Sequence, residues 1–240
     1  MKSTRSTSPV RARHRGFTLV EILVATTIFG LVTLGILRVF IQALNIYYYD
    51  TGKIFVNRDI RRFTTEMTEK ATYSNYFRIY PAYTDLTRSV TAYADASDPD
   101  AGFTTALADT SVADGATGDC LALVFKSPTD DTKITQIIVY YRSPANPSDP
   151  TSIGPVRRHT QDVPDAYAKR SVDQLLGITD PTQDDIVVEL SRDLATGKLF
   201  YNFKDRSIVV QGDIIQRGGM INSRNAQATN TYNFTVSPRG

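Results

Sequence analysis

An apolar run near the N-terminus is the feature that most constrains this chain. It reads RGFTLVEILVATTIFGLVTLGIL over residues 15–37, and the only charges between residues 17 and 44 are Glu21 and Arg38. A helix needs about 20 mostly apolar residues to cross a bilayer, so this run is long enough. A carboxylate inside such a helix is unfavourable and indicates a functional position by default.

The residues before the run form a basic leader. Residues 1–16 contain no acidic residue and five basic ones, which are Lys2, Arg5, Arg11, Arg13 and Arg15. The chain has 27 basic residues in all, so 22 of them lie beyond the leader. With 25 acidic residues in the same region, residues 17–240 carry a net charge of −3. We therefore predict no nucleic-acid partner. Basic residues before a span keep that end cytoplasmic, which places everything after residue 45 on the far side.

Two ordinary explanations of this N-terminus account for the residues poorly. A secretory signal peptide needs a small-x-small cleavage site after the apolar run, but residues 38–50 read RVFIQALNIYYYD. A plain signal anchor leaves Glu21 without a role, although an acid in a spanning helix costs up to roughly 3 kcal/mol at the centre.

The third interpretation is a resemblance. A basic leader that ends in Gly16, then Phe17, then Glu21 as the fifth residue after that glycine, resembles the N-terminus of type IV prepilins and of type II secretion pseudopilins. The resemblance implies that a prepilin peptidase would cut between Gly16 and Phe17 on the cytoplasmic side and methylate the new amine of Phe17. It also implies an assembly role, in which Glu21 would meet the N-terminal amine of a neighbouring subunit. Such a pair fixes register more than it adds stability.

In this interpretation residues 17–44 form the membrane half of an N-terminal helix. Its apolar side chains include Leu19, Ile22, Leu23, Ile28, Phe29, Leu31, Leu34 and Leu37. Many major pilins carry a proline where Arg38 stands here, and an arginine at that point can extend to the head groups. Gly30 and Gly35 either weaken the helix or allow close packing against another helix.

A second, amphipathic half of the helix is expected over residues 45–80, ending before Pro81. Its apolar stripe, spaced by three and four residues, consists of Val56, Ile60, Phe63, Met67 and Ala71. We expect this stripe to pack on a sheet of the same chain. The segment NRDIRRFTTEM (residues 57–67) resembles the same region of J-class minor pseudopilins and their pilus counterparts.

Residues 81–240 are predicted to form a globular, β-rich domain with long loops. Strands are expected at residues 120–125, 134–141, 154–159, 186–190, 198–203, 207–211 and 231–236. The first two should form a hairpin, and residues 195–198 fit a tight turn between the fourth and the fifth. The fold class is therefore α+β, with one long N-terminal transmembrane-to-domain helix packed on a mostly antiparallel sheet.

Few residues of the domain suggest chemistry. Residues 84–118 are rich in aspartate, and Asp98, Asp100, Asp109 and Asp114 raise the question of calcium, but no EF-hand spacing exists and a solvated loop is favoured. His159 and Cys120 provide no zinc ligand set, and Cys120 should be a small buried residue. Asp184 and Asp185 fit the start of a strand better than an acid–base dyad. We predict no enzyme activity, cofactor, metal or small-molecule substrate.

The resemblance thus implies a minor pilin or pseudopilin, a structural subunit of a type II secretion pseudopilus or a type IV pilus. Its partners would be the prepilin peptidase, other pilins and the bacterial inner membrane, with the C-terminal domain periplasmic. A DNA-uptake minor pilin is the alternative within the family. From another class, a single-pass sensor or binding protein would keep its leader and tolerate replacement of Glu21. The sequence does not separate secretion from pilus systems.

Overall fold

A computed structural model describes residues 16–83, 111–143, 154–177, 181–192, 198–217 and 227–239. The chain divides into two compact units, Met1–Tyr47 and Tyr48–Gly240. One helix, α1 (Leu19–Tyr73), contributes its N-terminal part to the first unit and its C-terminal part to the second. Each unit is described by itself below.

In the first unit, α1 is long and apolar enough to span a membrane, and it is the one described helix that is. Its large apolar side chains are exposed, because no other described part of this unit packs on them. The threonine hydroxyls do not break this apolar surface. Thr27 Oγ1 donates to the carbonyl of Leu23 and Thr33 Oγ1 to that of Phe29, both at 2.8 Å. Hydroxyls bonded inside the helix can face lipid without an unsatisfied donor.

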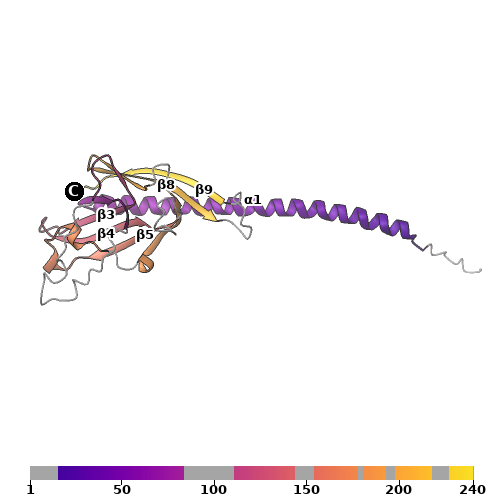
Figure 1. Ribbon diagram of the computed structural model, residues 1–240, viewed down its shortest axis with the longest axis horizontal. Coiled ribbons are helices and arrows are strands. Elements are labelled where there is room, and N and C mark those ends of the chain that lie inside the picture. The colour runs from indigo at the N-terminus through magenta and orange to yellow at the C-terminus, as the bar shows by residue number, and fades with distance from the viewer. Residues whose placement is uncertain are drawn as a thin grey trace, which may run out of the picture. The chain divides into compact units, whose positions relative to one another are not determined.

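In the second unit, the predicted stripe is confirmed. Val56, Phe63, Met67 and Ala71 are fully buried, and Ile60 packs partly buried beside them. They belong to a cluster that includes sheet residues such as Leu121, Leu123, Ile138 and Tyr140. Figure 1 shows this part of α1 lying against the strands. Burial of these four side chains supplies apolar contact between this part of α1 and the sheet.

The predicted extension of the helix to residue 80 is wrong. Helix α1 ends at Tyr73, and strand β1 (Tyr76–Tyr80) follows at once. Ser74 closes the helix by donating its Oγ to the Ala71 carbonyl at 2.7 Å. Backbone pairing of β1 with the neighbouring strand prevailed over the local helical pattern, as tertiary contacts often do.

The strands form one antiparallel sheet in the described residues. Their bounds are β2 (Thr117–Gly118), β3 (Cys120–Lys126), β4 (Ile134–Arg142), β5 (Gly154–Asp162), β6 (Asp185–Arg192), β7 (Phe200–Phe203), β8 (Ser207–Arg217) and β9 (Gln227–Val236). The order is β1-β3-β4-β5-β6-β8-β7-β2, with β9 also on β8. The α+β class and the β3–β4 hairpin are confirmed.

One predicted connection differs from the structure. The tight turn expected at residues 195–198 would pair β6 with β7, but in the described residues these two strands do not pair with each other and both pair with β8. Residues 195–197 themselves lie outside the described residues. The long strand β8 explains the difference, since its first half pairs with β7 and its second half with β6.

Both faces of the sheet are covered. On β3, Leu121 and Leu123 face the α1 cluster, whereas Cys120, Ala122 and Val124 face a second cluster. The second face is covered by a segment that contains the short helices η3 (Asp165–Tyr167) and α2 (Val172–Leu175). A third short helix, η4 (Pro181–Gln183), precedes β6. Two covered faces explain why residues 120–125 are a continuous apolar run rather than an alternating one.

The two ends of the strand order approach each other. The Val112 amide donates to the Ile79 carbonyl at 2.7 Å, and the Asp119 amide donates to the Pro81 carbonyl at 3.1 Å. A Cβ on Gly118 would lie 2.2 Å from the Tyr80 carbonyl oxygen, so only glycine fits there. The sheet is therefore bent back on itself between β2 and β1.

Polar contacts complement the apolar contact between α1 and the sheet. The Glu66 carboxylate on α1 accepts from Tyr140 Oη at 2.9 Å and pairs with Arg158 Nη1 at 2.7 Å. Burial, and after it the charge of Glu66, raises the pKa of Tyr140 well above its usual value. The hydroxyl thus stays protonated at neutral pH and can donate to Glu66. Arg158 also pairs with Asp185 at the start of β6.

A buried ion pair lies at the end of β4. Arg142 is fully buried, and its Nη2 lies 2.6 Å from Asp119 Oδ2. The other Asp119 oxygen accepts from the Leu199 amide at 3.1 Å. Asp119 thereby joins the β2–β3 connection, β4 and the start of β7 through one carboxylate.

We predict that Asp119→Asn lowers the free energy of unfolding by about 3–5 kcal/mol, because it leaves a buried guanidinium without its counter-charge. The matched control is Lys198→Gln, since Lys198 Nζ lies 3.8 Å from the same carboxylate but is more exposed. That control should cost no more than about 1 kcal/mol. Denaturant unfolding of the full chain in detergent, followed by the circular dichroism of the sheet, measures both. Equal losses for the two variants would contradict a dominant role of Arg142–Asp119.

Candidate functional site

The residues just before α1 are the candidate site. Gly16, Phe17 and Thr18 precede the helix, and 83% of Phe17 is exposed. A Cβ placed on Gly16 would meet no heavy atom within 4 Å. The backbone at the Gly16–Phe17 bond is thus open to an approaching molecule.

Thr18 and Glu21 form a reciprocal capping arrangement at the start of α1. Glu21 Oε2 accepts from the Thr18 amide and from Thr18 Oγ1, both at 2.9 Å. In return, Thr18 Oγ1 accepts from the Glu21 amide at 3.2 Å. This is the capping box, in which a threonine and a glutamate three residues later satisfy each other's backbone donors. The T-x-x-E spacing that could have indicated this capping box is present in the sequence at residues 18–21.

The capping box leaves part of the carboxylate available. Both Thr18 donors reach the same oxygen, Oε2, and no described residue donates to Oε1 of Glu21. The carboxylate also lies in the first turn of α1, where the unpaired amides favour negative charge. One oxygen therefore stabilises the helix start while the other can accept a bond from outside the chain.

The apolar residues singled out from the sequence lie on α1, and all of them are exposed. They are Leu19, Ile22, Leu23, Ile28, Phe29, Leu31, Leu34 and Leu37, with exposed fractions from 51% to 79%. Side chains this large and this exposed on an isolated helix need lipid or another apolar partner. Gly30 and Gly35 lie on the same stretch, and open space surrounds both.

The candidate residues of the domain make structural contacts. His159 Nδ1 lies 2.7 Å from Asp184 Oδ1, and Tyr141 Oη donates to the other oxygen of Asp184 at 2.5 Å. Asp184 thus fastens the start of β6 to β4 and β5. Cys120 is buried in β3, as predicted.

The calcium question receives a partial answer. Asp114 accepts a hydrogen bond from the Lys204 amide at 2.6 Å, which stabilises the β7–β8 turn. Asp98, Asp100 and Asp109 lie outside the described residues. In the part of the chain that the structure describes, no group of three or more His, Cys, Asp or Glu side chains is arranged to hold a metal.

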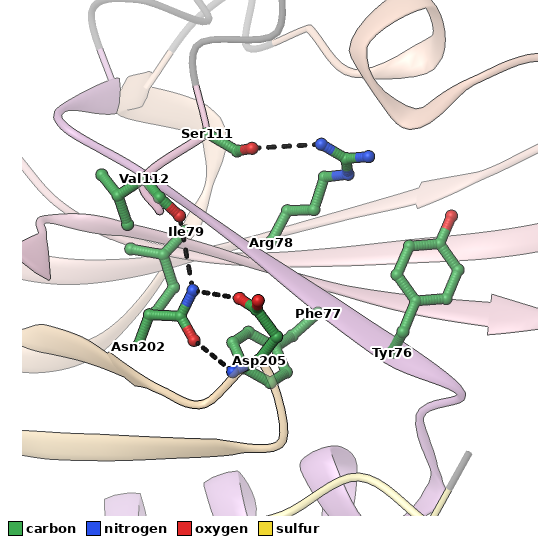
Figure 2. A pocket seen from close by; sticks show the side chains of 8 residues that line it. All are labelled: Tyr76, Phe77, Arg78, Ile79, Ser111, Val112, Asn202 and Asp205. Carbon is green, nitrogen blue, oxygen red and sulfur yellow. Dashed lines mark hydrogen bonds between the residues drawn. The ribbon is translucent and has the colours of Figure 1, made fainter. Parts of the chain in front are cut away.

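A cavity of about 370 Å³ lies beside β1 (Figure 2). Its polar wall groups bond to one another: Arg78 Nη1 donates to Ser111 Oγ at 3.1 Å, and Asn202 Nδ2 donates to Asp205 Oδ1 at 2.6 Å. Asn202 Nδ2 also lies 3.3 Å from the Val112 carbonyl. The cavity is thus explained as a gap between β1 and the β7–β8 turn.

We predict that Thr18→Val increases amide hydrogen exchange in the first turn of α1, because valine has no hydroxyl to accept from the Glu21 amide or to donate to the Glu21 carboxylate. Thr18→Ser keeps the hydroxyl and should leave exchange near that of the natural protein. Exchange of the Val20 and Glu21 amides in detergent micelles, measured by NMR, tests this. If the valine and serine variants exchange alike, the hydroxyl does not stabilise the helix start.

Comparisons with known proteins agree with this geometry at the N-terminus. Residues 11–37 match the protein-family model described as the prokaryotic N-terminal methylation motif. Neither the curated proteins nor the solved structures gave a significant match. The matched segment contains Gly16, Phe17, the capping box and the exposed apolar part of α1. The chain thus carries this motif at the start of a long N-terminal helix that is followed by an antiparallel sheet, the arrangement that the resemblance to type IV prepilins implies.

Proposed function

We propose that this protein is a minor pilin or pseudopilin, a structural subunit of a type II secretion pseudopilus or a type IV pilus. The observation that carries the proposal is the methylation motif at residues 11–37, followed by a helix whose apolar side chains are exposed. Such a helix first anchors the subunit in the bacterial inner membrane and then packs against the helices of other subunits. The role is structural rather than enzymatic.

In this proposal, a prepilin peptidase cuts between Gly16 and Phe17 on the cytoplasmic side and methylates the amine of Phe17. Two observations support the position of the cut. The bond precedes α1 and is therefore outside regular structure. Gly16 has no side chain to hinder the approach of the peptidase, and its surroundings are open. The basic residues of the leader leave with the cut, and the domain then lies on the periplasmic side.

Assembly in this proposal depends on Glu21. After cleavage, the amine of Phe17 carries a positive charge in an apolar surrounding and needs an acceptor. Oε1 of Glu21 on a neighbouring subunit is suited to accept from it, because the capping box uses only Oε2. An ion pair between two subunits sets the axial register of their helices more than it adds stability.

The processing step predicts a defined N-terminus. Protein from the membranes of its native host should begin at N-methyl-Phe17, and intact mass with N-terminal sequencing measures this. Gly16→Val should leave the leader attached, because a branched side chain blocks approach to the bond. Val10→Ala, a change inside the leader, is the matched control and should be processed normally.

Two results would contradict the processing step. A start at Met1 in cells with an active prepilin peptidase would make the motif a simple anchor and favour a single-pass sensor or binding protein. A product of mature length from the Gly16→Val variant would exclude the proposed cleavage site.

The assembly step predicts that charge at residue 21 matters beyond capping. Glu21→Gln keeps an acceptor for Thr18 but removes the charge, so it should insert in the membrane normally and assemble poorly. Thr18→Val is the matched control, since it removes the hydroxyl bonds of the cap and keeps the charge. Cross-linking of subunits in sheared filament fractions measures assembly, and membrane fractionation measures insertion.

The comparison between the two variants decides the role of the carboxylate. A defect in Glu21→Gln with near-normal assembly of Thr18→Val supports pairing with a neighbouring amine. The reverse pattern would show that Glu21 acts only through the helix cap. Normal filaments from both variants would exclude an assembly role for this position.

A further inference from the structure

An exposed surface on α1 lies at the start of the second unit, where the helix leaves its apolar part. It consists of Tyr48, Tyr49, Lys53, Ile54, Phe55 and Arg58, which we call the collar surface. Ile54 is 68% exposed, Phe55 39% and Tyr49 36%. Exposed apolar side chains therefore continue along the helix up to Phe55.

Cations of the collar surface lie over its aromatic rings. Lys53 Nζ lies 4.7 Å from the centroid of the Tyr49 ring, and Arg58 Cζ lies 5.0 Å from that of Phe55. These spacings of four and three residues place each cation beside its ring on the same part of the helix surface. An apolar ring next to an extended cationic side chain is the combination that membrane interfaces favour.

The charge of this region is opposite to that of the rest of the mature chain. Residues 48–62 contain four basic residues and two acidic ones, whereas residues 17–240 as a whole carry a net charge of −3. Of the two acidic residues, Asp59 forms an ion pair with Arg58, in which Arg58 Nε lies 3.7 Å from Asp59 Oδ1. Among the described residues, no carboxylate lies within ion-pair distance of Lys53, Arg61 or Arg62. A basic surface on an acidic body favours an anionic partner.

We propose that the collar surface binds the head groups of anionic phospholipids. The inference uses the anchoring of α1 and does not depend on cleavage or filament assembly. Tyr48 to Arg58 corresponds to a rise of roughly 15 Å along a helix. The head-group layer is roughly 5–8 Å thick, and its charge acts over a Debye length of about 8 Å beyond it. The two lengths together match the rise of the collar surface along the helix. In this arrangement Tyr48 and Tyr49 of the collar surface lie at the edge of the hydrocarbon layer. Lys53 and Arg58 lie further along the helix, at the depth of the charged phosphate groups.

A fluorescence experiment tests this proposal on the full chain. The protein contains no tryptophan, so Ile54→Trp introduces a single reporter on the collar surface. The matched reporter is Tyr73→Trp at the C-terminal end of α1, where the Tyr73 side chain is 72% exposed. Each variant is placed in phosphatidylcholine vesicles that contain an equal mole fraction of brominated phosphatidylglycerol or brominated phosphatidylcholine. Bromine quenches tryptophan on contact, so quenching reports which lipid lies near the reporter.

The proposal expects the tryptophan at residue 54 to be quenched more by the brominated anionic lipid, and the one at residue 73 by neither. In the Ile54→Trp background, replacing Lys53 and Arg58 by glutamine should remove most of this excess, as should high salt. The control replaces Lys204 and Arg206, exposed cations of the β7–β8 turn, and should keep the excess.

Three outcomes would overturn the proposal. Absence of quenching at residue 54 would place the collar surface away from lipid. Equal quenching by the two lipids, unchanged by the glutamine variants, would show contact without selection for anionic head groups. A blue-shifted emission that depends on the protein-to-lipid ratio and resists both quenchers would identify a second copy of the chain as the occupant.

Discussion

The domain is organised by the burial of one narrow stripe of α1 against one face of the sheet. Val56, Phe63, Met67 and Ala71 are spaced so that a single side of the helix meets the strands. Because the stripe is narrow, the remaining faces of this part of α1 carry charged side chains. Glu66 lies at the border of the stripe, where its bonds to Tyr140 and Arg158 limit rotation of the helix on the sheet. Apolar burial supplies the attraction, and these polar bonds supply the orientation.

The opposite face of the sheet requires a different solution, since no second long helix is available in the described residues. The segment with η3 and α2 covers it, and Tyr80 Oη donates to Asp173 Oδ1 at 2.8 Å across that contact. Asp119 joins three segments at the end of β4 through its pair with Arg142. Coverage by short segments depends on such specific bonds, because each segment alone buries little apolar area.

The sequence allowed the elements with strong local patterns to be predicted, and the structure shows where long-range contacts decided instead. The stripe of α1 has a clear helical period, and the β3–β4 hairpin consists of two apolar segments on either side of a turn-forming segment, so both were predicted correctly. The end of α1 was not, because pairing with β3 converts Tyr76–Tyr80 into a strand. Likewise, no local pattern indicates that β6 and β7 both pair with β8, or that Arg142 meets Asp119. At the N-terminus, the Gly-Phe-Thr-Leu-Val-Glu pattern was sufficient to predict the motif. The same pattern contains the T-x-x-E spacing of Thr18 and Glu21, which indicates the capping box.

The capping box changes how pairing at Glu21 should be understood. A free glutamate side chain would lose rotamer freedom when it pairs with an amine, and that loss opposes association. Here Thr18 already holds the carboxylate through Oε2, so much of this ordering precedes any encounter between subunits. Pairing through Oε1 would then leave the helix start intact, and a subunit would not have to lose one bond to form the other. On the proposed function, the backbone amide next to Phe17 therefore positions Glu21, and the Thr18 hydroxyl adds a second bond to the same oxygen.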